Sequence, residues 1–133
     1  MTGLYLMFDR TCEKALKTYQ DAFSVKATMV QKYKDMPPNP NFTIPDSDMD
    51  LILHSRIEID GTEIMCADSS IPRIAGDNMF VNVTSNDSEF VKKAWSVLSN
   101  NGKIIMDLNP TFFAKLHGHL QDEFGINWMF TAQ

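Results

Sequence analysis

The sequence predicts an α+β fold of two tandem βαβββ modules that form a curved, mostly antiparallel eight-stranded sheet around a cavity, with the helices on its convex side. Three observations predict it: two stretches of helical period, two β-rich runs each divided by a turn at glycine, and an element order that occurs twice. We expect one domain over residues 1–133, with module one at 1–74 and module two at 75–133. The rival arrangement, a ferredoxin-like sandwich, predicts fewer strands and no second hairpin.

The first module begins with a short buried strand at residues 4–8. Residues 12–23 then switch to helical period, because apolar residues fall three or four apart on one face: Cys12, Ala15, Leu16, Tyr19 and Phe23. Thr11 is the expected N-cap. An extended stretch follows at 25–33, and a hairpin at 51–59 and 62–68 turns at Asp60-Gly61.

The second module repeats this order about 75 residues later. A strand is expected at 79–83, and Asn86 with Glu89 resembles a capping box for the second helix, which ends near Asn100-Asn101-Gly102. An extended stretch at 103–108 follows. A hairpin at 114–120 and 126–131, with its turn near Phe124-Gly125, completes the module. The hairpins repeat at an offset of about 64, so the first module carries about eleven extra residues within 35–50.

Composition excludes several classes of function. The 133 residues carry a net charge of -5, so a nucleic-acid partner is not expected. Two cysteines, Cys12 and Cys66, do not make a disulfide framework. No apolar run is long enough to span a membrane, and the N-terminus does not resemble a signal peptide, so we expect a cytoplasmic protein with no membrane partner.

Several segments together resemble a known family. The first half carries Cys12-Glu13-x-Ala15-Leu16-x-x-Tyr19, Ile52-x-His54 and Ile64-Met65-x-x-Asp68, and the second carries Phe112-Phe113, Gly118 and Asp122-x-Phe124-Gly125-x-x-Trp128-Met129. In these segments the chain is similar to the PhnB-like branch of the vicinal-oxygen-chelate superfamily, which includes glyoxalases, bleomycin-resistance proteins and dioxygenases. The resemblance implies the paired-module fold, a small-molecule ligand and a homodimer.

The resemblance also implies a position for a metal. Enzymes of this superfamily hold one divalent ion with His, Gln or Glu from the first and last strands of each module. Here the last-strand positions fall on Met65 and Met129, and the first-strand positions fall within one residue of Leu4 and Met79. Thioethers are soft ligands that hard divalent ions disfavour, so we expect no metal and no other cofactor.

The expected ligand-binding residues are His54, Arg56, Met65, Phe113, His117 and Met129. Period-two alternation places Ile52, His54, Arg56 and Glu58 on one strand face, where His54 and Arg56 are the polar anchors of an anionic or carbonyl ligand. The alternative is a solvated face with a cross-strand ion pair. The methionines predict either an adaptable apolar pocket or plain core filling.

Three further features allow more than one interpretation. The His117-Gly118-His119 segment is a metal half-site or a surface strand with two ordinary histidines. The proline-rich stretch 36–45 is a lid that closes with Phe42 and Ile44, a dimer contact or a disordered connector. Alternation with Met129 turns Trp128 toward the helix and therefore into the core.

These observations predict a metal-independent small-molecule-binding protein. A metal-dependent glyoxalase- or dioxygenase-type enzyme with an altered site, using His54, His117 and His119, is the alternative. A purely structural dimer is the third possibility. The family is often named a methyltransferase. The sequence does not support that activity, because no glycine-rich cofactor loop follows a strand.

Overall fold

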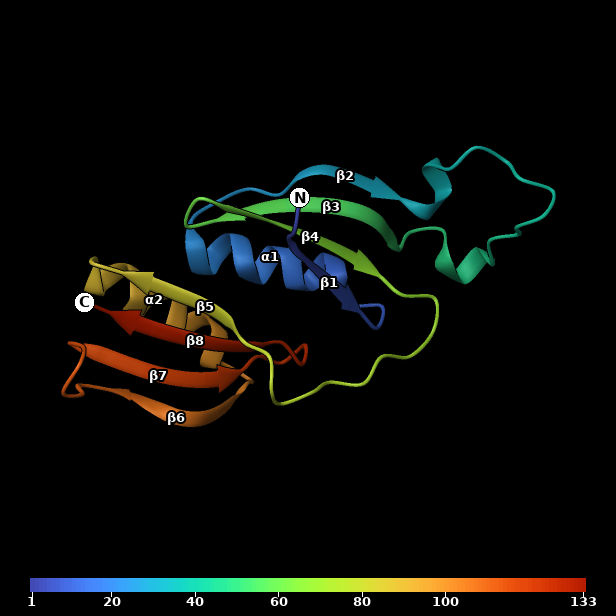
Figure 1. Ribbon diagram of the computed structural model, residues 1–133. Helices are drawn as coiled ribbons and strands as arrows, with labels where there is room; N and C mark the ends of the chain where they lie inside the picture. The colour runs from blue at the N-terminus through green and yellow to red at the C-terminus, as the bar shows by residue number, and fades with distance from the viewer. The chain divides into compact units, whose positions relative to one another are not determined.

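The computed structural model describes residues 1–133 and confirms the predicted order of two βαβββ modules (Figure 1). Hydrogen bonds join the strands as two sheets of four, in the orders β1-β4-β3-β2 and β5-β8-β7-β6. In each sheet the first pair of strands is parallel and the other pairs are antiparallel. The elements are β1 (Leu4–Phe8), α1 (Cys12–Phe23), β2 (Thr28–Lys32), β3 (Ile52–Ile59), β4 (Thr62–Asp68), β5 (Val81–Ser85), α2 (Ser88–Ser99), β6 (Lys103–Asn109), β7 (Leu116–Gln121) and β8 (Asn127–Ala132).

The chain divides into two compact units. Unit 1 comprises Met1–Lys17 and Val25–Arg73, and unit 2 comprises Thr18–Ser24 and Ile74–Gln133. Each unit therefore contains one four-stranded sheet, and the two units are described separately below.

The core of unit 1 lies between the start of α1 and one face of its sheet. Buried residues alternate along β3 as Ser55, Ile57 and Ile59, as expected for a sheet that is covered on one side. The buried Asp68 carboxylate fixes the helix to the sheet, because it accepts the backbone N–H of Cys12 and that of Ile52, each at 2.9 Å. This satisfies one of the unpaired amides at the start of α1.

Unit 2 has an aromatic core. Tyr19 and Phe23, from the last turns of α1, pack against Trp128 of β8 with ring centroids 5.3 and 5.4 Å away. Phe130 stacks against both Phe23 and Trp128, with ring centroids 6.3 and 6.1 Å away. Trp128 is fully buried, which confirms that it faces the core. Helix α2 adds Val91, Ala94 and Leu98.

Two predicted boundaries in unit 2 were wrong. The N-cap of α2 is Asp87, not Asn86, since the Asp87 side chain accepts the N–H groups of Glu89 and Phe90 at 3.1 Å. Strand β5 begins at Val81, not Met79, because the pairing with β8 starts at Val81, and Val81 and Val83 are the buried residues of the strand. Met79 is exposed and precedes the strand.

The inserted segment between β2 and β3 is ordered at both ends. Two short 3-10 helices, η1 (Tyr33–Asp35) and η2 (Asp46–Asp48), frame it, and an isolated bridge joins Asn39 to Phe42. Arg10 anchors the second end, with Nη1 2.6 Å from the Asp48 carboxylate and Nη2 donating to the Ser47 carbonyl at 2.7 Å. No helix of the chain is long and apolar enough to cross a membrane.

Candidate functional site

The first sheet carries polar residues on the face that does not bury the core. Across the strands, Tyr5 of β1 pairs with Met65 of β4, and Met65 pairs with Arg56 of β3. Residues paired directly across strands project from the same face of a sheet. Tyr5, Arg56 and Met65 therefore share one face, and Tyr5 is 45% exposed there.

A hydrogen-bonded group crosses this face. The Tyr5 hydroxyl lies 3.1 Å from Nδ1 of His54, and Nε of Arg56 donates to Nε2 of the same imidazole at 3.5 Å. The guanidinium Nη1 of Arg56 is 3.5 Å from the Glu63 carboxylate. The structure thus brings together three of the predicted site residues, His54, Arg56 and Met65.

The Tyr5–His54–Arg56 group presents hydrogen-bond donors to a ligand. Burial raises the pKa of the Tyr5 hydroxyl, with smaller contributions from the nearby Cys12, Cys66 and Tyr33, so the phenol keeps its proton at neutral pH. If Nε2 of His54 accepts from Arg56, Nδ1 carries the proton and donates to Tyr5. The Tyr5 O–H and the remaining guanidinium N–H groups are then free to meet a ligand oxygen.

The second sheet carries a pair of imidazoles on β7. Nε2 of His117 lies 3.0 Å from Nε2 of His119, and Nδ1 of His117 lies 2.9 Å from the Thr131 hydroxyl. Burial, together with the neighbouring His117, lowers the pKa of His119. Both histidines are half-buried.

Aromatic and apolar groups surround the two rings. Phe113 packs edge-on against His117 at 4.9 Å between centroids, and Phe80 lies 5.3 Å from His119. Met129 of β8 pairs directly with His119. Unit 2 therefore brings together the other three predicted residues, Phe113, His117 and Met129.

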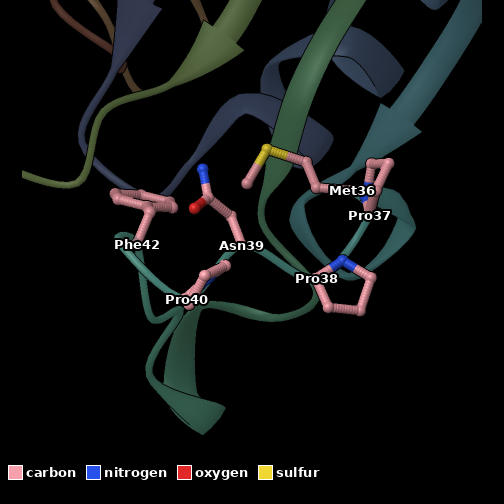
Figure 2. A pocket seen from close by; sticks show the side chains of 6 residues that line it. All are labelled: Met36, Pro37, Pro38, Asn39, Pro40 and Phe42. Atoms are coloured by element: carbon pink, nitrogen blue, oxygen red, sulfur yellow. The ribbon is translucent and has the colours of Figure 1, made fainter.

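A separate hollow lies in the inserted segment and has a volume of about 580 Å³ (Figure 2). Its lining contains no titratable side chain, and Asn39 supplies its one polar side chain. This hollow offers apolar contact and no group for proton transfer or charge recognition. The residues that line it are Met36, Pro37, Pro38, Asn39, Pro40 and Phe42.

Comparison with known proteins identifies the family. A family model described as 3-demethylubiquinone-9 3-methyltransferase matches residues 2–131. The chain belongs to this family. Protein YjdN from Escherichia coli (strain K12) is 28% identical over 135 residues, covering 94% of this chain and 90% of YjdN.

Two solved structures show the fold of the family. The PhnB protein from Bacillus cereus has a TM-score of 0.80 at 24% identity, covering 99% of this chain and 98% of that chain. Protein PA1353 from Pseudomonas aeruginosa has a TM-score of 0.86 at 22% identity, covering 100% and 97%. The predicted PhnB-like resemblance and the predicted α+β fold of two tandem βαβββ modules are therefore confirmed, with the strands in two sheets of four.

The residues at the expected metal positions of this fold do not fit a hard divalent ion. Met65 and Met129 offer thioethers, and their partners on the first strands are Tyr5 and Asn82. No three His, Cys, Asp or Glu side chains come together anywhere in the chain. The donor set therefore lacks the carboxylate and imidazole ligands that hold Mg²⁺, Mn²⁺ or Zn²⁺ in proteins.

Sequence reasoning missed Asn82, Thr131 and the role of Tyr5. The expected first-strand position near Met79 was wrong, because the residue opposite Met129 is Asn82. Tyr5 lay within the expected range for module one, but its contact with His54 depends on a side chain that reaches over β4. Thr131 pairs with His117 across β7 and β8, which follows only from the strand register.

Proposed function

We propose that this chain is a small-molecule-binding protein that needs no divalent metal, and that its ligand joins an apolar body to a carbonyl or anionic oxygen. The observation that carries the proposal is the Tyr5–His54–Arg56 group on an open sheet face beside Met65. A cationic side chain with unused donors, next to a polarisable thioether, suits a ligand of this mixed character.

The polar anchors are held before a ligand arrives. His54 contacts both Tyr5 and Arg56, and Glu63 contacts the far side of the guanidinium. Side chains that are already oriented lose less conformational entropy on binding than free ones do. The partial exposure of the group leaves its donors accessible to a ligand oxygen.

We propose the same role for Phe113, His117 and Met129 in unit 2. There the ring of Phe113 packs against the imidazole of His117, and Met129 adds a thioether opposite His119. In our proposal modules 1–74 and 75–133 make up one ligand-binding domain.

Methyl transfer, the activity in the family's description, is not part of the proposal. The turn from β1 to α1 is Asp9-Arg10-Thr11, and the turn from β5 to α2 is Asn86-Asp87. Neither contains the glycines that let a backbone approach a nucleotide-type cofactor closely.

We also infer a homodimer and a cytoplasmic location. The edge strand β6 exposes Ile104, Ile105 and Met106 at 47–49%, and Phe112 beyond it is fully exposed. A long apolar edge strand tends to pair with another chain unless it is protected, and most soluble oligomers are homo-oligomers. We therefore infer that a second copy of the chain covers β6. The two buried cysteines are unpaired, as expected in a reducing compartment.

Titration with 1-anilinonaphthalene-8-sulfonate tests the ligand proposal, because this dye joins planar rings to an anionic group. We expect saturable binding to the folded chain, and Arg56→Met should weaken it at least tenfold, since the lost contact is charge-assisted. Lys92→Met, which removes an exposed cation on α2, should leave the affinity unchanged. Equal affinity in both variants, or no saturable binding, would refute the proposal.

A further inference from the structure

The imidazole pair of unit 2 has a geometry that the proposed ligand site does not need. His117 and His119 stand on either side of Gly118 on β7, so their side chains project from the same face. Their Nε2 atoms approach to 3.0 Å. Two imidazole nitrogens come this close when a proton lies between them or a cation takes its place.

Thr131 orients the pair. Its hydroxyl lies 2.9 Å from Nδ1 of His117 and can accept the proton of that nitrogen. In that tautomer Nε2 of His117 presents its lone pair to His119. A hydrogen bond of this kind, from the distal nitrogen of a histidine to a neighbouring oxygen, is the usual support of a metal-ligating imidazole.

Two thioethers flank His119. Met129 of β8 pairs with it on one side and Met106 of β6 pairs with it on the other, next to an irregularity in the β6–β7 register. Direct cross-strand partners project from the same face with Cβ atoms about 5 Å apart. Phe80 packs against His119, and Phe113 packs against His117.

We propose that His117, His119 and Met129, with Met106 as a fourth ligand, bind a soft monovalent metal ion of the Cu(I) class. Thioether sulfur selects Cu(I) over hard divalent ions, and imidazole nitrogen suits copper equally well. No carboxylate belongs to the set, which disfavours Mg²⁺, Ca²⁺ and Mn²⁺.

This site shares only Met129, on β8, with the metal position of the superfamily. The superfamily position draws on the first and last strands of both modules, whereas this set centres on β7 and lies entirely within unit 2. It also goes beyond the proposed function, which rests on the Tyr5–His54–Arg56 group of unit 1 and assigns His117 and Met129 to contacts with a small-molecule ligand, not to a metal.

A competition titration tests the proposal. The full, reduced chain is titrated under anaerobic conditions with Cu(I) in the presence of bicinchoninate, and one Cu(I) per chain is expected. His119→Gln should abolish binding, and Met129→Leu should weaken it. Thr131→Val, which keeps every ligand, should weaken it about tenfold, as outer-sphere changes do. Met29→Leu, which removes an exposed thioether from the edge strand of unit 1, should have no effect.

Magnetic resonance of the imidazoles identifies the ligands directly. Ag(I), which is redox-inert, should shift the side-chain signals of His117 and His119 and leave those of His54 unchanged. Shifts at these two imidazoles would separate this site from binding at the rival soft ligands Cys12 and Cys66. Unchanged Cu(I) affinity in His119→Gln and Thr131→Val, or equal affinity for Zn(II), would overturn the proposal. Neither result would alter the dye binding at Arg56, so the two proposals fail separately.

Discussion

The Tyr19 hydroxyl donates a hydrogen bond to Oδ2 of Asp122 across 2.6 Å, 103 residues away in the sequence. The same oxygen accepts from the indole N–H of Trp128 at 2.9 Å. Oδ1 accepts the backbone N–H groups of Phe124 and Ile126, each at 2.9 Å. One buried carboxylate thus holds a helix end, a tight turn and the largest core side chain together within unit 2.

Asp122→Asn should destabilise the protein by about 1–3 kcal/mol, because a buried donor is left unsatisfied. All four partners of Asp122 can donate, and an amide replaces one acceptor oxygen by a donor. Whichever way the amide turns, its NH₂ group meets either the indole N–H or two backbone N–H groups. Urea denaturation measures the loss. Asp107→Asn, an exposed carboxylate on β6, is the control, and an equal loss there would contradict the interpretation.

The contribution of Asp122 should fall as the pH rises. Burial raises the pKa of its carboxyl above the ordinary 3.8, although the hydrogen bonds from Tyr19, Trp128 and the backbone oppose the shift. The folded state therefore holds this proton more tightly than the unfolded state does. The stabilisation that comes from this tighter proton binding is complete below pH 3.8. It is lost as the pH rises past the raised pKa of Asp122.

Unfolding free energies of wild type and Asp122→Asn, measured across the acid range, test this sign. The difference between them should shrink as the pH rises toward neutrality. A difference that grows with pH would show that the hydrogen bonds, not burial, set the pKa of Asp122.

Local pattern was enough to predict most of the fold. The first strand and helix were predicted to the residue at 4–8 and 12–23, because apolar spacing and the buried side of each element agree there. The Asp60-Gly61 turn was also correct, and both residues have positive φ, as a tight hairpin requires. Asn86 and Asp87 are both good cap residues, so local pattern could not separate them.

The candidate sites depend on register, which local pattern does not fix. His54 and Arg56 were found because alternation within one strand places them on one face. Tyr5 reaches His54 over an intervening strand, and Met106 joins His119 at an irregular pairing. Such neighbours follow from which strands pair and at which residues, and one sequence does not determine that.

Both cysteines should be inert in the folded protein. Burial raises the pKa of the Cys66 thiol to about 12, and burial raises that of Cys12 still further. At pH 8 Cys66 is then almost entirely a thiol, whereas the thiolate is the reactive form. Ellman's reagent should modify neither thiol until urea unfolds the chain. Ser96→Cys, at an exposed position on α2, supplies a reactive control, and rapid labelling of the wild type would refute the expectation.

Gly118→Ala should destabilise the protein by about 1–3 kcal/mol through overpacking. A Cβ atom at Gly118 would lie 2.9 Å from the Leu108 Cα and 2.9 Å from the Trp95 ring. The backbone neighbour cannot rotate away as a side chain end can. Gly3→Ala, where a Cβ would meet nothing within 4 Å, is the matched control in thermal unfolding. Equal stability of the two variants would show that β6 and Trp95 can move away from the added methyl group without a measurable loss of stability.

The proposed homodimer should dissociate when a charge enters the edge of β6. Ile105→Lys places an ammonium group in the exposed run Ile104–Met106, and burying it against a second copy would cost several kcal/mol unless it found a partner. Sedimentation equilibrium should show a dimer for the wild type and a monomer for Ile105→Lys. Lys92→Met on α2 tests whether any surface change has this effect, and it should remain dimeric. A monomeric wild type would mean that the apolar edge stays uncovered by a second chain, whereas a dimeric Ile105→Lys would move the interface to another surface, such as the exposed Met29 and Val30 of β2.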